Sequence, residues 1–99
     1  MNKKAKFIVA IDHKAGHHVN WTYIAINGAT EAWQARNWFI GNHKDIENVY
    51  CARILKRVGA RKFTDVEMVH TDGSGCTYKP SERSKWEIWD NEITRNVAI

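Results

Sequence analysis

The fold of this chain is decided first by the stretch KAKFIVAID, residues 4–12. Along it, apolar residues alternate with lysines and an aspartate at a period of two, which is the pattern of a half-buried β-strand. The alternating apolar residues are Ala5, Phe7, Val9 and Ile11. We therefore predict a strand over residues 4–12.

A second strand is predicted over residues 18–27, which are rich in β-branched and aromatic side chains and end at Asn27-Gly28. Residues 13–17 between the two predicted strands have the composition of a turn. These two segments therefore form the best hairpin candidate in the chain.

A helix follows, capped by Thr30, with Glu31 in its first turn and an end near Gly41. Its apolar arc is broad. The arc consists of Ala32, Trp33, Ala35, Trp38, Phe39 and Ile40. Either this helix is deeply packed or it leaves one tryptophan at the surface.

Residues 46–58 fit two interpretations. Asp45 and Glu47 at the start and Lys56 and Arg57 at the end suit the dipole of a helix. Alternating side chains suit a strand, which we favour because the following segment, residues 63–71, also alternates.

The last third is less regular. Residues 71–83 are a polar excursion with a turn at Asp72-Gly73, residues 86–89 return to strand character, and the tail after Asn91 either docks or frays. The expected fold class is α+β, one domain over residues 1–99 in the order β-β-α-β-β-β, with one helix on a mostly antiparallel sheet.

Composition and length limit the class of protein. The 99 residues are 43% hydrophobic and 26% charged, which predicts one folded domain. No apolar run approaches the roughly 20 residues of a membrane helix, and no cleavage site follows the basic start. We expect a cytoplasmic protein, located in the host cell if a phage encodes it, with Cys51 and Cys76 as free thiols and Cys51 buried.

Sequence motifs for catalysis or metal binding are weak. His13, His17 and His18 share one loop, and His70, Asp72 and Cys76 surround another, but neither set has the paired spacing of a zinc site. We predict no metal and no cofactor. A metal-independent ribonuclease that uses the loop histidines is a distant alternative, and we expect a binding protein rather than an enzyme.

Basic residues carry the strongest functional signal. The net charge is +4, and one run of five cations within ten positions contains no acid. The candidate nucleic-acid-binding residues are Arg53, Lys56, Arg57, Arg61, Lys62, Lys79, Arg83 and Lys85. Such residues neutralise phosphates, which gives an affinity that falls with salt.

Aromatic residues offer a second surface. Unpaired bases stack on exposed rings, and tryptophans also form hot spots for protein partners. The candidates for stacking or partner binding are Trp33, Trp38, Tyr78 and Trp89, while Trp21, Trp86 and one helix tryptophan are assigned to the core.

In layout and size, roughly the first 55 residues resemble small bacteriophage proteins. The resemblance is carried by the lysine-led strand KKAKFIV (3–9), a second strand and the helix opening ATEAWQA (29–35). Those proteins include anti-CRISPRs and inhibitors of toxin–antitoxin modules. The resemblance implies an inhibitor of a host defence or toxin system and carries over no functional residue.

Two functions follow as expectations. In the first, the cationic residues bind nucleic acid, with RNA or a single strand favoured. In the second, an exposed aromatic patch occludes a host protein without nucleic acid. No membrane partner is expected, and the sequence is compatible with a homo-oligomer.

Overall fold

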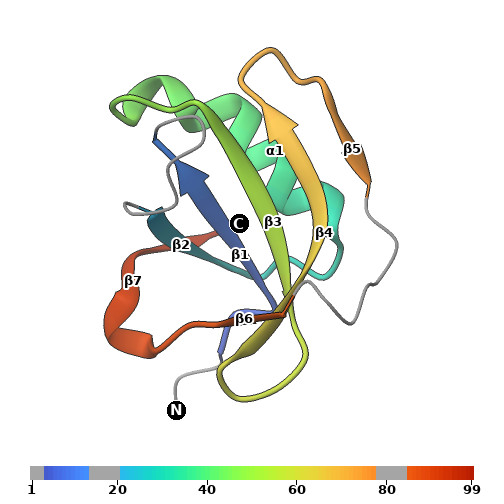
Figure 1. The fold of residues 1–99 in the computed structure, drawn as a ribbon, viewed down its shortest axis with the longest axis vertical. Helices are drawn as coiled ribbons and strands as arrows, with labels where there is room; N and C mark the ends of the chain where they lie inside the picture. The colour runs from blue at the N-terminus through green and yellow to red at the C-terminus, as the bar shows by residue number, and fades with distance from the viewer. Residues whose placement is uncertain (1–3, 14–20, 78–84) are drawn as a thin grey trace.

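Strand β1 (Phe7–Asp12) lies inside a mixed sheet of seven strands, with β2 on one side of it and β3 on the other. The structure, a computed structural model, describes residues 4–13, 21–77 and 85–99 (Figure 1). The other elements are β2 (Trp21–Asn27), α1 (Ala32–Asn42), η1 (His43–Asp45), β3 (Cys51–Arg57), β4 (Lys62–His70), β5 (Gly75–Thr77), β6 (Lys85–Glu87), η2 (Asp90–Glu92) and β7 (Ile93–Ala98).

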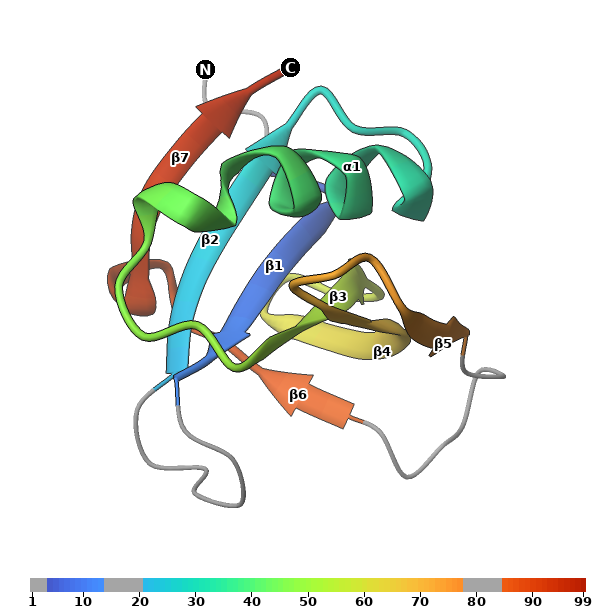
Figure 2. The ribbon, with the colours of Figure 1, turned by 90° about the horizontal axis from the view of Figure 1, so that it is seen from above.

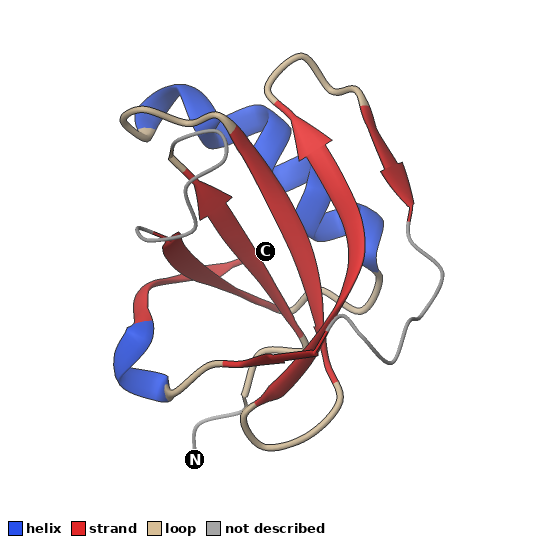
Figure 3. Cartoon of the chain, viewed as in Figure 1, coloured by secondary structure: helices blue, strands red, loops and turns tan. Residues whose placement is uncertain are grey.

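The sheet has the strand order β5-β4-β3-β1-β2-β7, and β6 also pairs with β4. All pairings are antiparallel except β2 with β7, which is parallel. Helix α1 packs across one face of the sheet (Figure 2). The predicted α+β class, with one helix on a mostly antiparallel sheet, is therefore confirmed (Figure 3).

Both faces of β1 are buried. All six of its residues are inaccessible or nearly so, including Ile8 and Ala10, which point away from the helix. The predicted strand is confirmed from Phe7 to Asp12, but its residues do not alternate between buried and exposed. Its continuous apolar run is instead typical of a strand that is covered on both sides.

Two hydrophobic clusters cover these two faces. The first lies under α1 and includes Phe39 and Val9. The second lies on the other face and contains Phe63 and Ile88. The chain between β6 and β7 crosses this second face (Figure 1). Trp86 meets Trp21 edge-on there, with their ring centroids 5.0 Å apart.

Helix α1 begins at Ala32, and Thr30 is not its N-cap residue, in contrast to the prediction. The Gln34 side chain explains the difference, because its Oε1 accepts hydrogen bonds from the Thr30 and Glu31 backbone N–H groups at 2.7 and 2.9 Å. Glu31 is consequently the N-cap residue. Across the described ranges, no helix combines the length and the apolar character needed to cross a bilayer.

Residues 51–57 form the third strand, which confirms the strand interpretation but shortens it. Asn48 has a φ of 55°, in the left-handed region, so an extended strand cannot pass through it. Ile46 and Val49 pack against the first cluster instead.

Two strands were not predicted from the sequence. β5 lies in the expected polar excursion, and β7 is the tail, which docks rather than frays. β5 reaches its place through Gly75, where a Cβ would lie 1.9 Å from the carbonyl oxygen of Met68. Only glycine permits that approach.

Truncation of Phe39 tests the first cluster. Phe39 is fully buried, so Phe39→Ala is expected to lower the free energy of unfolding by about 3–5 kcal/mol. Trp33→Ala on the same helix is the control, since Trp33 is 54% exposed and its loss is expected to cost at most about 0.5 kcal/mol. Urea denaturation followed by circular dichroism measures both, and equal losses would contradict the packing described.

Candidate functional site

Arg57 is held by the fold at the end of β3. Its Nε donates to the Ala5 carbonyl at 2.7 Å, and a terminal nitrogen donates to the Ala60 carbonyl. The guanidinium also lies 4.6 Å from the centre of the Phe63 ring. Burial lowers the pKa of Arg57, and the nearby charge of Asp90 opposes this change. Arg57 therefore ties the N-terminal segment to the β3–β4 turn.

Arg53 is also engaged within the fold. Its guanidinium lies 2.9 Å from a carboxylate oxygen of Asp65, a residue that is 4% exposed. Burial raises the pKa of Asp65, while the hydrogen bond and charge of Arg53 lower it. Two of the predicted nucleic-acid-binding residues, Arg53 and Arg57, thus have internal partners.

The sheet register brings three lysines to one face. Lys56 lies opposite Thr64 on β4, and Thr64 lies opposite Lys85 on β6. Lys62 precedes Thr64 by two residues. Directly opposite residues of antiparallel strands, and residues two apart, share a face. Lys56, Lys62 and Lys85 therefore project from the same side of the sheet.

All three lysines are exposed, and none forms an ion pair with a described residue. One acid, Glu87, lies opposite Lys62. Further positive charge lies close by, because the Lys6 carbonyl accepts from the Arg57 N–H at 2.8 Å and Lys4 and Lys6 are both exposed.

Arg61 and Trp89 form a stacked pair at the β3–β4 turn. The Arg61 guanidinium lies 4.0 Å from the centre of the Trp89 ring, which remains 48% exposed. The backbone holds the two together, because the Ile88 N–H donates to the Arg61 carbonyl at 2.9 Å. We call Lys56, Arg61, Lys62, Lys85 and Trp89 the basic turn.

Trp33 and Trp38 belong to another surface. They line a groove of about 460 Å³ between α1 and the end of β7. The other lining residues of this aromatic groove are Gly28, Gln34, Asn37 and Ile99. β3, β1 and β2 lie between β4 and β7 in the sheet. The structure therefore separates Trp89 from the two helix tryptophans with which it was grouped.

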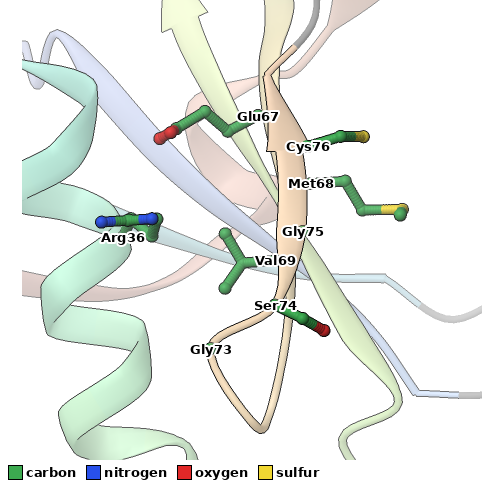
Figure 4. A pocket seen from close by; sticks show the side chains of 8 residues that line it. All are labelled: Arg36, Glu67, Met68, Val69, Gly73, Ser74, Gly75 and Cys76. Atoms are coloured by element: carbon green, nitrogen blue, oxygen red, sulfur yellow. The ribbon is translucent and has the colours of Figure 1, made fainter.

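A second hollow, of about 340 Å³, lies between α1 and the β4–β5 hairpin (Figure 4). Glu67 and Val69 point toward the helix that carries Arg36, while Met68 and Cys76 point away from it. The Nε of Arg36 and the Oε2 of Glu67 are buried without a hydrogen-bond partner. The hollow is therefore polar, and the Cys76 thiol does not enter it.

The first histidine loop is described only at His13. One ring nitrogen of His13 lies 3.0 Å from the Glu47 carbonyl and the other 2.5 Å from the Thr22 hydroxyl, so both are occupied. In the second loop, Asp72 accepts from the backbone and the hydroxyl of Ser74, and these bonds lower its pKa. Among the described residues, no group of three potential ligands lies close enough to hold a metal ion.

Three predicted site residues, Tyr78, Lys79 and Arg83, lie outside the described residues, as do His17 and His18. Sequence reasoning missed Arg95 and Ile99, which lie beside and within the aromatic groove. The alternation of Ile93, Val97 and Ile99 was the available signal.

Comparisons with protein-family models, curated proteins and solved structures found no match to this chain.

The two thiols are expected to differ in reactivity. Burial, and secondly the charge of Asp12, raise the pKa of Cys51, whereas Cys76 is exposed. Because the thiolate is the reactive form, the native protein is expected to react with Ellman's reagent at Cys76 alone. Cys76→Ser should then show no fast reaction until it is unfolded in denaturant, and fast labelling of native Cys76→Ser would contradict the buried position of Cys51.

Proposed function

We propose that this domain binds an unpaired nucleic-acid strand, RNA in the first instance, through the basic turn. The observation that carries the proposal is the convergence of Lys56, Lys62 and Lys85 on one face of the sheet. These lysines come from three different strands, so only the folded chain presents them together.

Exposed cations without internal acids can neutralise phosphates. Lys56, Arg61 and Lys85 meet this condition within the described part of the chain. Phosphate binding releases the counterions of the nucleic acid, and the affinity then depends strongly on salt. The basic turn therefore supplies the electrostatic part of binding.

The Arg61–Trp89 pair supplies a stacking surface. A base that stacks on an exposed ring contributes about 1–3 kcal/mol, whatever its identity. Trp89 is half-exposed, and the Arg61 guanidinium stacks on its ring. This arrangement suits bases that are already unpaired.

Duplex DNA suits the molecule less well. A recognition helix carries polar and basic side chains into the major groove. The only charged residue of α1 is Arg36, and its Nε is buried in the polar hollow. Helix α1 therefore carries no basic side chain, beyond this half-buried arginine, with which to bind in a major groove.

We further propose that this binding is not coupled to catalysis. Both ring nitrogens of His13, a candidate acid–base group, are occupied by Thr22 and Glu47. The resemblance to bacteriophage inhibitors then suggests a role: the domain masks a nucleic acid that a host defence enzyme or toxin requires. This role rests on the layout of the chain and on the basic turn together.

Charge reversal tests the basic turn. Arg61→Glu and Lys85→Glu are each expected to weaken binding to a fluorescein-labelled, mixed-sequence single-stranded RNA by about tenfold at low salt, because each replaces a phosphate contact with repulsion. Each lost contact should also reduce the slope of log K against log salt by about 0.7. Fluorescence anisotropy at several salt concentrations measures both quantities.

Lys44→Glu is the matched control because it changes the net charge by the same amount. Lys44 lies on η1, before the start of β3, whereas the basic turn lies at the other end of β3. It is expected to bind almost as well as the unmodified protein. Arg57→Glu is unsuitable as a test of binding, because it removes the hydrogen bonds to the Ala5 and Ala60 carbonyl groups that hold the fold. Equal losses for Lys44→Glu and Arg61→Glu would show that only net charge matters and would refute the proposed site.

A further inference from the structure

The outer edge of β7 has no strand partner among the described residues. β7 pairs with β2 alone, through a parallel register that runs from Tyr23–Ile93 to Asn27–Ala98. Such an edge presents backbone N–H and C=O groups that another strand can bind. Natural edge strands are commonly protected by lysine or proline, and residues 93–99 contain neither.

Hydrogen-bond directions identify the free groups. The Ile99 N–H donates to the Asn27 carbonyl at 3.0 Å, so Ile99 turns its backbone toward β2. Because these directions alternate along a strand, Val97 also faces β2, while Asn96 and Ala98 turn theirs outward. The open edge therefore offers the N–H and C=O groups of Asn96 and Ala98.

The aromatic groove lies along the same edge. Val97 packs against the cluster under α1, and Ile99, on the same side of β7, lines the groove and is 53% exposed. Trp33, across the groove, is 54% exposed. A strand added beside β7 would place every second side chain over Val97, Ile99 and the groove.

The charged groups near the groove indicate which side chains a docking strand would carry. The side chains that line the groove carry no charge. The cation beside it is Arg95, whose guanidinium lies 5.6 Å from the centre of the Trp38 ring. Residues 93–99 contain no acidic side chain. The complementary segment therefore carries an acidic side chain opposite Arg95 and a large apolar side chain opposite Ile99.

We propose that the β7 edge and the aromatic groove form a docking site for an extended segment of a partner protein. The segment adds a strand to the sheet at Asn96 and Ala98, sets a carboxylate against Arg95 and inserts an apolar side chain between Trp33 and Ile99. This site is separate from the basic turn and does not depend on nucleic-acid binding.

The probes are two capped peptides. In one, Glu, Val and Leu occur in this order and are separated by Thr residues, and in the other the order is reversed. A parallel and an antiparallel added strand are thus both tested. Titration of the isotope-labelled full chain is followed by NMR. Saturable shifts of the Asn96 and Ala98 amides and of the Trp33 indole are expected for one peptide. A scrambled peptide, with its apolar and acidic residues adjacent, is expected to cause none.

Two variants make the test specific. Ala98→Pro removes an outward N–H without touching the β2–β7 hydrogen bonds, and it is expected to weaken binding about fivefold. Arg95→Glu is expected to weaken binding of the peptide that binds the unmodified protein about threefold. The same variant should prefer a peptide in which Lys replaces the Glu residue. Arg61→Glu should leave peptide binding unchanged. If Ala98→Pro does not fold, the charge exchange at Arg95 decides alone.

Other outcomes overturn the proposal. The absence of saturable shifts with both peptides would do so. So would a dimer of the free protein, seen by sedimentation, that Ala98→Pro dissociates, because the occupant would then be a second copy. Competition between single-stranded RNA and the peptide for the β7 amides would assign the edge to nucleic acid.

Discussion

The structure depends on a central strand that is buried on both faces. Phe7 and Val9 point toward α1, while Ile8 and Ala10 point to the opposite side, and β2 and β3 pair with both edges of the strand. A strand of this kind needs a cover on each face, because exposed apolar area costs roughly 25 cal/mol per Å². One helix covers one face, and the chain from β6 to β7 must cover the other.

That covering chain also builds both candidate surfaces. At its start, β6 pairs with the first residues of β4 and brings Lys85 beside Thr64. In its middle, Trp89 lies under Arg61, and Ile88 fills the second cluster. At its end, β7 reaches the far edge of the sheet beside the groove. The requirement to bury β1 thus determines where the basic turn and the free edge lie.

Positive charge serves two purposes in this molecule. Arg53 and Arg57 are half-buried, and each is bound by oxygens of its own chain. Arg61 remains at the surface, where it stacks on an aromatic ring. A count of cations along the sequence does not separate these roles, since the nearest partners, Asp65 and Ala5, lie on other parts of the chain.

The class of fold, the helix, the first hairpin and the strand character of the segments that form β3 and β4 could be predicted from the sequence. These features depend on periodicity and local turn residues, which neighbours in the chain specify. The sequence also located the basic run and the tryptophans, but it did not show which of them face outward.

Only the packed fold shows that Lys85 joins Lys56 and Lys62, that Asp65 neutralises Arg53 and that the tail becomes an edge strand. Each of these outcomes is a contact between segments distant in the sequence. The register shift in β4 opposite Ile54 and Leu55 is of the same kind: it turns Asp65 toward the second cluster and Val69 toward the helix. Register and burial are properties of the packed sheet, and no local pattern specifies them.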